Sequence, residues 1–468
     1  MKRKELIKLG LGSRELADAA VDAVKAASHT GLKKPALRRL LRDLVANPSL
    51  FDEDEHFGEL SKKVAARRAK AESYVPRRDK APYRRWGDDI DPQAVRQMEN
   101  ACSLPVAAQG ALMPDAHVGY GLPIGGVLAT RSSVIPYAVG VDIACRMKMT
   151  VLDLPVSSLS GARDRLRKVL ANETRFGIGA SFRERRQHEV LDDDWSVTPV
   201  TQRLKDKAWA QLGTSGSGNH FVEYGTLEVF SKGSESLGLP EGEHLALLSH
   251  SGSRGAGATV ASHYSKLAME LHPELPKELR HLAWLDLSTE AGQEYWQAMQ
   301  LMGRYAAANH ACIHHHISKA LGADVLADIE NHHNFAWQET HQGETLVVHR
   351  KGATPAAEGD LGIIPGTMAS PAYLVRGLGQ PSSLCSSSHG AGRVMSRKRA
   401  KNSFTWSDTR KLLERRGVEL ISAGLDEVPM AYRDIDKVMA AQRDLVESLA
   451  RFQPRMVKMA PAGERPED

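Results

Sequence analysis

Two glycine-rich segments of this 468-residue chain hold side chains that suit metal chemistry. In "MPDAHVGYGLPIGG" these are Asp115 and His117, and in "VGVDIACRM" Asp142 and Cys145 lie three residues apart. A cysteine that binds a divalent metal does so as a thiolate, and the metal and nearby cations lower the pKa of the thiol. The alternative is that Cys145 is a small buried apolar residue, which is common for a free cysteine.

Three further segments add histidines beside glycine or at the end of an apolar, β-branched run. They hold Asn219, His220 and Glu223 in "GTSGSGNHFVEYG", His250 and Arg254 in "LLSHSGSRGAG", and His332 and His333 in "NHHNF". A single histidine of this kind is more often structural, but histidine, cysteine and aspartate together are what a transition-metal site requires. Arg254 stands among glycines that expose backbone N–H groups, an arrangement that suits phosphate.

The segment "SSSHGAGRVMSR", residues 386–397, places His389 directly before three small residues and close to Arg393 and Arg397. Small neighbours let a bulky ligand approach the backbone. Guanidinium groups can hold phosphate through two hydrogen bonds. This histidine is therefore a candidate for chemistry on a phosphate-bearing ligand.

The densest histidine tract, "NHACIHHHISK", is interpreted differently. Adjacent positions of a helix point in different directions, so its histidines cannot all face one ion. We expect them on a helix surface: His310, His314, His315 and His316.

The composition is that of an ordinary globular protein, with 42% hydrophobic and 25% charged residues. No apolar run approaches the roughly 18 residues of a membrane helix, and "MKRKELIKLG" lacks the apolar stretch of a signal peptide. We therefore expect a cytoplasmic protein without a membrane partner. Four scattered cysteines without a C-x-x-C pair argue against a disulfide framework, and a net charge of +5 does not by itself establish a nucleic-acid partner.

Residues 1 to about 75 are rich in Ala, Leu, Lys and Arg and poor in Gly. "KKPALRRLLRDLVANPSLF" has Pro35 in a first helical turn and leucines at helical spacing, and "LSKKVAARRAKAES" predicts a helix with a basic face. That face could contact nucleic acid, although a solvated helix is favoured. The prediction is a helical N-terminal extension over residues 1–78, joined through "YVPRRDKAPYRRWGDD" to a catalytic domain over 79–468.

From about residue 105 the chain changes to short β-type runs that end in polar loops, such as "EHLALLSHSGSRG" and "GETLVVHRKGA". Helices are expected over 293–320 and 431–453. Strands and helices do not alternate steadily, which favours a mixed α+β domain over a doubly wound sheet. The fold prediction is thus α+β, a mixed β-sheet with surrounding helices.

Eight motifs in order resemble the RNA-splicing ligase RtcB family, from about residue 80 to Lys458. They are "MPDAH", "GVDIACRM", "GSGNHFVE", "HSGSRG", "HHNF", "HRKGA", "IIPGTM" and "SHGAGRVMSR". The resemblance implies two Mn(II) ions with a cysteine bridging both, a covalent histidine–GMP intermediate at His389, and GTP as co-substrate. The implied metal ligands are Asp142, Cys145, His220, His250 and His333.

The resemblance also implies a nucleotide site and an RNA site. Glu223 would read guanine, whose Watson–Crick edge presents two donors that a carboxylate accepts. The implied GTP- or GMP-binding residues are Asn219, Glu223, His333, Asn334, Thr367, Met368, His389, Gly390, Ala391, Gly392, Tyr432 and Lys458. The implied RNA phosphate-binding residues are Arg254, Arg393 and Arg397.

The implied reaction joins an RNA 3′-phosphate or 2′,3′-cyclic phosphate end to a 5′-hydroxyl end. His389 takes GMP from GTP, GMP moves to the 3′-phosphate, and the 5′-hydroxyl attacks this activated end and releases GMP. The expected setting is RNA splicing or repair, with an archease-type activator as a possible partner and a monomer or weak dimer as the active form.

This chain departs from the family pattern in one turn. "PGTMASPAY" retains a hydroxyl at Thr367, but Ala369 and Ala372 replace the usual Gly and Ser. Ten further residues, "MAPAGERPED", follow Lys458. These differences suggest a divergent branch with its own RNA.

Two alternatives remain open from the sequence. A two-metal phosphoesterase or nuclease would use the same ligands but gives no reason for His389 in its motif. A catalytically idle RNA-binding protein predicts losses among the metal ligands, yet all five positions and the histidine are present.

Overall fold

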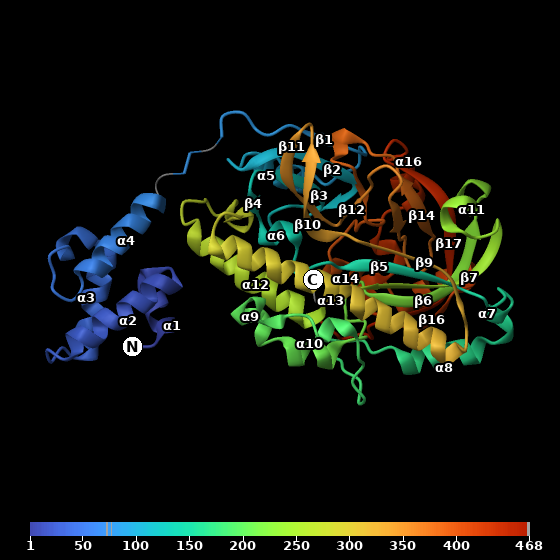
Figure 1. The fold of residues 1–468 in the computed structure, drawn as a ribbon, viewed down its shortest axis with the longest axis horizontal. Coiled ribbons are helices and arrows are strands. Elements are labelled where there is room, and N and C mark those ends of the chain that lie inside the picture. The colour runs from blue at the N-terminus through green and yellow to red at the C-terminus, as the bar shows by residue number, and fades with distance from the viewer. Residues whose placement is uncertain (72–73, 76, 466–468) are drawn as a thin grey trace. The chain divides into compact units, whose positions relative to one another are not determined.

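The computed structural model describes residues 1–71, 74–75 and 77–465, which divide into two compact units (Figure 1). One unit holds residues 1–76 and 266–284, and the other holds 77–265 and 285–468. The first unit thus includes 266–284, a segment that the sequence assigned to the catalytic domain. Residues 72–73 of the predicted basic helix, residue 76 of the predicted connection and 466–468 of the C-terminal tail lie outside the described residues.

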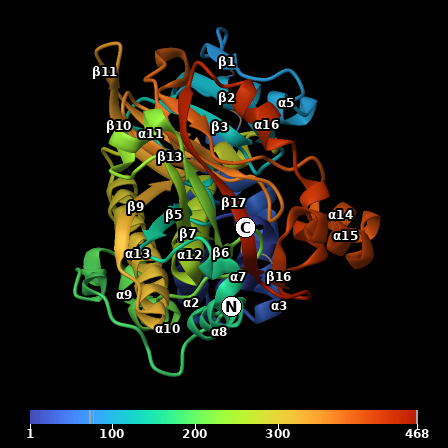
Figure 2. The ribbon, with the colours of Figure 1, turned by 90° about the vertical axis from the view of Figure 1, so that its right-hand side faces the viewer.

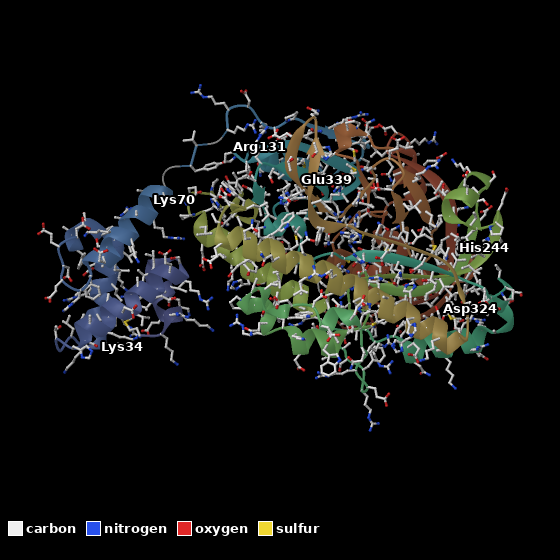
Figure 3. All side chains as sticks on the ribbon, in the orientation of Figure 1. Lys34, Lys70, Arg131, His244, Asp324 and Glu339 are labelled. Atoms are coloured by element: carbon white, nitrogen blue, oxygen red, sulfur yellow. The ribbon has the colours of Figure 1, made fainter. Side chains whose placement is uncertain are left out.

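The first unit has its own hydrophobic core. Leu37, Leu41 and Leu44 are buried at the helical spacing that predicted this helix, and Pro35 stands in its first turn. Charged side chains stay outside, as for Lys34, which pairs with Glu5 at 3.3 Å (Figure 3). The elements are α1 (Arg3–Leu6), η1 (Ile7–Leu11), α2 (Arg14–Ser28), α3 (Lys34–Ala46), η2 (Pro48–Phe51) and α4 (Gly58–Ala71).

The second unit is built on an eight-stranded sheet whose main path is antiparallel throughout, with one parallel strand beside it. In spatial order the strands are β13 (Leu361–Ile364), β14 (Ala372–Gly377), β17 (Val446–Met459), β6 (Phe221–Val229), β7 (Gly242–Ser251), β5 (Arg146–Leu152) and β9 (Val325–His332), with β16 (Glu419–Ser422) beside β17.

A second, five-stranded sheet mixes parallel and antiparallel pairs. Its strands are β1 (Tyr83–Arg85), β2 (Ala107–His117), β3 (Ile124–Thr130), β11 (Glu344–Lys351) and β10 (Asn334–His341). Two small ladders pair β12 (Ala353–Pro355) with β15 (Ser386–Ser388) and β4 (Ser133–Val134) with β8 (Leu285–Asp286).

Helices surround these sheets (Figures 1 and 2). They are α5 (Pro92–Cys102), α6 (Pro136–Val139), α7 (Ser158–Gly161), α8 (Arg163–Glu173), α9 (Pro199–Gln202), α10 (Lys205–Gln211), α11 (Ser231–Leu237), α12 (Arg254–Leu271), α13 (Glu290–Leu321), α14 (Arg397–Ser403), α15 (Trp406–Arg416) and α16 (Ile435–Ala440). The last residues of α12, from Lys266 on, and the short 3-10 helix η5 (Arg280–Leu282) belong to the first unit. The 3-10 helices of the second unit are η3 (Glu189–Leu191), η4 (Trp195–Val197), η6 (Pro381–Ser383), η7 (Leu425–Glu427) and η8 (Pro429–Ala431). Among the described residues, no helix has the length and apolar character needed to span a membrane.

The strand alternation of β7 divides the core of the large sheet. Ala246 and Leu248 belong to one hydrophobic cluster, whereas Leu245 and Leu247 pack on the other face with Ile313 of α13. The α+β prediction is confirmed, because antiparallel strands dominate and helices lie outside them. The predicted strands around residues 245–251 and 344–351 and the predicted helix over 293–320 are also confirmed.

Two predictions were wrong. The segment 431–453 is not one helix, because α16 ends at Ala440 and β17 begins at Val446. The histidine tract is not wholly on a helix surface either: His310 and His314 are buried where α13 packs on the sheet, and His314 Nε2 lies 2.8 Å from the Ser249 hydroxyl. The helical spacing of four places these two histidines on the packed face, while His315 is exposed.

Candidate functional site

The register of four neighbouring strands brings the predicted metal ligands to one end of the large sheet. Arg146 at the start of β5 pairs with Ser251 of β7 and with His332 of β9, and Phe221 of β6 pairs with His250. Cys145 and His220 therefore stand just before two strands, and His333 follows another. Segments almost 200 residues apart in the chain meet because the strand pairing aligns their ends.

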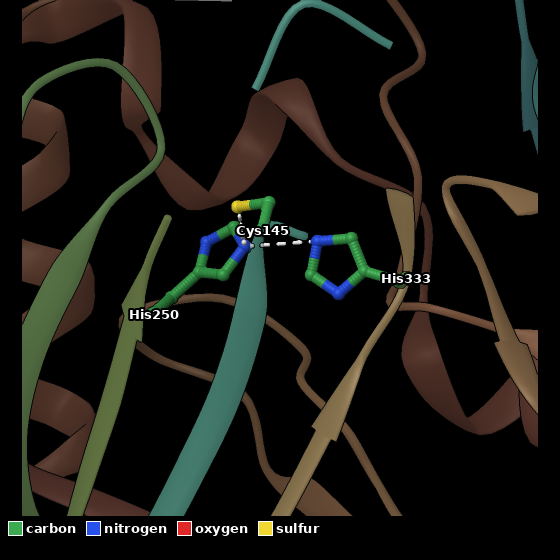
Figure 4. Close-up of side chains that lie close together, drawn as sticks. All are labelled: Cys145, His250 and His333. Atoms are coloured by element: carbon green, nitrogen blue, oxygen red, sulfur yellow. Dashed lines mark hydrogen bonds between the residues drawn. The ribbon is translucent and has the colours of Figure 1, made fainter. Parts of the chain in front are cut away.

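Cys145 lies at the centre of the resulting cluster. Its Sγ atom is 3.4 Å from His220 Nε2. The same atom is 3.2 Å from His250 Nε2, which in turn is 3.2 Å from His333 Nε2 (Figure 4). Two groups of possible metal ligands result, and Cys145 belongs to both. They are Asp142, Cys145 and His220, and Cys145, His250 and His333, each with ligand atoms within 4.8 Å of one another.

The backbone directs these side chains inward. Ala144 adopts a left-handed conformation (φ 56°), which is costly for a residue other than glycine and turns the chain just before Cys145. At Gly252 a Cβ atom would stand 2.0 Å from Asp142 Oδ2, so only glycine fits against this carboxylate. The other carboxylate oxygen, Oδ1, accepts a hydrogen bond from the Ser253 backbone at 3.0 Å.

The protonation states favour ligation. Burial alone would raise the pKa of Asp142, but hydrogen bonding and charge from His220, with Arg254 nearby, bring it below its ordinary value. Burial lowers the pKa of His250 to about 3 and that of His333 well below its ordinary range. The carboxylate is therefore ionised and both rings are neutral, the forms that bind a metal ion.

The donor set fits two ions that share the cysteine. Asp142 Oδ2 is buried 3.2 Å from His220 Nε2, and His333 Nδ1 is buried without a hydrogen-bond partner among the described residues, an arrangement of donor atoms that suits a ligand. The carbonyl of Asn219 lies 3.2 Å from His250 Nδ1 and holds the proton there, which leaves Nε2 for coordination. Sulfur, imidazole and carboxylate donors together suit a first-row transition metal.

His389 lies beside this cluster. The centre of its ring is 5.0 Å from that of His333. The β12–β15 ladder positions it, since Ser388 pairs with Ala353, whose backbone N–H donates to the His333 carbonyl at 3.3 Å. Asp115 on β2, fully buried, lies 2.7 Å from His389 Nδ1. The histidine is thus held between two sheets, with its Nδ1 side fixed.

A pocket of about 910 Å³ contains both the cysteine-centred cluster and His389, and that volume suits a nucleotide. Burial raises the pKa of Glu223, on its wall, well above the ordinary value. Eleven of the twelve residues implied for the nucleotide line this pocket: Asn219, Glu223, His333, Asn334, Thr367, Met368, His389, Gly390, Ala391, Gly392 and Tyr432.

The structure does not bring two predicted site residues into the pocket. Val457 and Met459 of β17 line it, so strand alternation turns Lys458 away, and the Lys458 ammonium group donates to the Ala171 carbonyl at 3.2 Å. Arg254 is only 2% exposed and its Nε donates to Thr214 Oγ1 at 3.2 Å, beneath His220. Arg254 therefore supports the ring of His220, a metal-ligand candidate, and is too buried for RNA to reach.

Arg393 and Arg397 do line the pocket, but acidic partners accompany them. Arg393 donates to Glu427 at 3.3 Å and to the Tyr432 hydroxyl at 3.0 Å, and its guanidinium stacks over the Tyr432 ring at 4.9 Å. Arg397 forms ion pairs with Glu427 and Asp426. These contacts hold the two guanidiniums at the pocket wall and partly neutralise them.

The structure explains why residue 392 is glycine, and the explanation differs from the predicted approach of a bulky ligand to the backbone. The φ of Gly392 is +71°, and a Cβ atom would stand 2.2 Å from the Asp115 carbonyl oxygen. Glycine is therefore required for the approach of this loop to β2, which brings the Asp115 carboxylate to His389.

Three functional candidates escaped the sequence prediction of the site. Asp115 was noted as a possible ligand but not as the partner of His389. Lys351, in the "HRKGA" motif, lines the pocket, and burial lowers its pKa to about 7. Ser370 accepts from the Thr367 backbone at 2.8 Å and closes the divergent turn. Lys351 could have been found from the sequence, because it is a charged residue at the end of a predicted apolar strand.

Comparison with known proteins identifies the family of this chain. The family model described as tRNA-splicing ligase RtcB matches residues 97–459, which include every predicted site residue. The RNA-splicing ligase RtcB of Escherichia coli is 35% identical over 404 residues, covering 79% of this chain and 95% of its own. The tRNA-splicing ligase RtcB of Thermococcus kodakarensis is 30% identical over 466 residues, covering 81% of this chain and 95% of its own. This chain belongs to the RtcB family.

Proposed function

We propose that this protein is a GTP- and Mn(II)-dependent RNA ligase that joins RNA 3′-phosphate or 2′,3′-cyclic phosphate ends to 5′-hydroxyl ends. The names of its relatives, RNA-splicing and tRNA-splicing ligases, support the reaction class. One observation carries the proposal: the His389 ring lies 5.0 Å from the ring of His333, a metal-ligand candidate, in one nucleotide-sized pocket.

The first step is a transfer of GMP to His389. Asp115 accepts a hydrogen bond from Nδ1–H, and in this tautomer the Nε2 lone pair is available. Nε2 forms a bond to the α-phosphorus of GTP as the bond from that phosphorus to the bridging oxygen breaks and pyrophosphate leaves. The product is a phosphoramidate, His389–GMP.

The metal ions belong at the cysteine-centred cluster. Asp142, Cys145 and His220 would hold one Mn(II), and Cys145, His250 and His333 the other. Bound there, the ions supply polarisation of phosphoryl oxygens and neutralisation of charge. Asn219 and Arg254 support the rings of His250 and His220 from behind.

Glu223 is the proposed reader of the base. Its carboxyl group is buried in the pocket wall, and no other role has been proposed for it above. The two donors of guanine, N1–H and the 2-amino group, would favour the ionised form of this carboxyl group, whose pKa burial raises, because a carboxylate accepts both hydrogen bonds. Adenine offers neither donor in this arrangement.

The next steps act on RNA. An oxygen of the RNA 3′-phosphate attacks the His389-bound GMP, so that the N–P bond breaks and a pyrophosphate-linked RNA end forms. The 5′-hydroxyl of the second strand then attacks the phosphorus of the RNA end, and GMP leaves. A cyclic phosphate is first opened by water to the 3′-phosphate.

Arg393 and Arg397 are the proposed phosphate contacts for RNA, because both line the pocket. The buried position of Arg254 gives that residue no such role. Dependence on an archease-type activator, a monomeric or weakly dimeric state and a cytoplasmic location stay predictions from the sequence.

Labelling of the protein tests the proposal. Protein incubated with Mn(II) and GTP labelled at the α-phosphate should retain label after denaturation, and His389→Ala should abolish it. His315→Ala, at an exposed position of α13, is the matched control and should label normally. Label on the His389→Ala variant would place the nucleophile elsewhere, and an unlabelled wild-type protein that cleaves phosphoesters would indicate a hydrolase instead.

A further inference from the structure

One stretch of the catalytic unit carries a strong positive charge. Residues 393–416 contain nine basic and two acidic residues, although the whole chain has a net charge of only +5. This stretch forms α14 and α15, which stand out at one edge of the unit (Figure 2). The basic residues are Arg393, Arg397, Lys398, Arg399, Lys401, Arg410, Lys411, Arg415 and Arg416.

The basic residues nearest the pocket form ion pairs with two buried carboxylates. Glu427 and Asp426 are buried, and they pair with Arg393 at 3.3 Å and with Lys401 at 3.5 Å, as well as with Arg397. These pairs hold the inner basic residues in place and offset part of their charge.

Four outer residues differ, and we call them the outer basic surface: Lys398, Arg399, Arg410 and Lys411. All four are exposed, and none forms an ion pair within the described part of the chain. The surface thus keeps a net positive charge toward solvent, where a polyanion can reach it.

This surface continues directly from the pocket. Residues 393–397 line the pocket, and Ser396 caps α14 by accepting from the Arg399 backbone at 3.3 Å. Another part of the lining carries Asp89 and Asp91, which repel phosphate. A polyanion whose end lies in the pocket is therefore held on the α14 and α15 side of the opening.

We propose that the outer basic surface binds the backbone of single-stranded RNA leading to the 3′-phosphate end, which enters the pocket beside Arg397. This inference rests on the proposed function for the identity of the strand. Contacts of lysine and arginine with phosphate are independent of sequence, so the surface supplies affinity and orientation without selecting bases.

The test compares two fourfold variants. The first carries Lys398→Gln, Arg399→Gln, Arg410→Gln and Lys411→Gln. The control carries Lys168→Gln, Arg203→Gln, Lys205→Gln and Lys319→Gln, four exposed basic residues that do not line the pocket. Both variants lose the same formal charge. A difference in RNA affinity between them therefore reflects where the lost charges lie, not the net charge of the protein.

The readout is the affinity for a fluorescein-labelled, 20-nucleotide single-stranded RNA with a 3′-phosphate, measured over a range of KCl concentrations. The first variant should bind about 10- to 100-fold more weakly at 0.1 M salt, with a salt slope smaller by up to about 3, because four phosphate contacts are lost. The control should stay within about twofold of the wild type.

Labelling with GTP in the absence of RNA separates this inference from the proposed function. The first variant should take up label at the wild-type rate and melt at the wild-type temperature, since the four side chains are exposed and outside the pocket. Pairwise variants at 398/399 and 410/411 should each show part of the loss.

RNA affinity equal in the two fourfold variants would overturn the inference. So would an unchanged RNA affinity combined with lost binding to a polyglutamate peptide, which would assign the surface to an acidic protein. An unlabelled wild-type protein would refute the proposed function, while the RNA comparison would still decide whether the surface binds RNA.

Discussion

The Nδ1 atom of His389 lies 2.7 Å from Oδ2 of Asp115, and the same oxygen accepts a hydrogen bond from the His389 backbone at 3.2 Å. The carboxylate comes from 274 residues earlier in the chain and is fully buried. It therefore fixes the orientation of the ring and favours the tautomer that carries its proton on Nδ1 and its lone pair on Nε2.

Asp115→Asn should slow labelling by GTP about 10²- to 10⁴-fold, because an amide can donate to Nδ1 and select the wrong tautomer. Single-turnover incorporation of label measures the rate. Asp444→Asn, which also alters a carboxylate bonded to a ring nitrogen but lies outside the pocket, should leave the rate unchanged. An unaffected rate in Asp115→Asn would remove this carboxylate from the chemistry.

Cys145→Ser should lose Mn(II) from both positions, since Cys145 belongs to both ligand groups. We expect affinity to fall at least about 10-fold, measured as metal retained after desalting. Cys385→Ser, at a free cysteine outside the pocket, is the control. Two ions retained by Cys145→Ser would contradict the shared-ligand assignment.

Glu223→Gln should reduce the preference for GTP over ITP, which lacks the 2-amino group. A hydrogen bond to a charged acceptor contributes about 1.5–3 kcal/mol, or roughly 10- to 100-fold in this ratio. Competition between the two nucleotides for labelling measures it. Glu228→Gln, exposed on the same strand, should keep the wild-type ratio. A ratio unchanged in Glu223→Gln would show that another group reads the base.

Lys351 gives a pH-dependent prediction. Burial lowers its pKa to about 7, so its positive charge is present below that pH and is lost as the pH rises above it. The KM for GTP should therefore rise from pH 6.5 to 8.5 in the wild type and rise less in Lys351→Arg, whose guanidinium stays charged. Lys232→Arg, outside the pocket, is the control. Parallel profiles for the wild type and Lys351→Arg would refute this role.

His349 links stability to pH. Burial lowers its pKa to about 4, and its Nε2 accepts from the Ile135 backbone at 2.9 Å. As pH falls, the unfolded chain binds the proton first. The stability from the neutral ring is therefore complete above about pH 6.5 and is lost toward pH 4, by up to about 1.4 kcal/mol per pH unit.

Urea unfolding of metal-free protein at pH 7.5, 6 and 5 measures this dependence. His349→Gln should have a shallower slope than the wild type, whatever its absolute stability. Identical slopes would show that His349 does not titrate differently in the folded and unfolded states.

The sequence alone was sufficient for the elements with strong local patterns. Leucine spacing in α3, the apolar runs of β7 and β11, and the long α13 were all predictable, because each is set by periodicity within one segment. It failed at 431–453, where apolar residues at helical spacing belong to a short helix and the start of a strand. Short apolar runs do not distinguish the two.

Residue types and ordered motifs also sufficed to name the ligand candidates and His389. Only the tertiary structure decided which of them meet. Strand register places Cys145 within 3.2 Å of His250, strand alternation turns Lys458 away, and close packing buries Arg254. The pairing of Asp115 with His389 depends on two sheets meeting, a relationship between distant segments that no local pattern encodes.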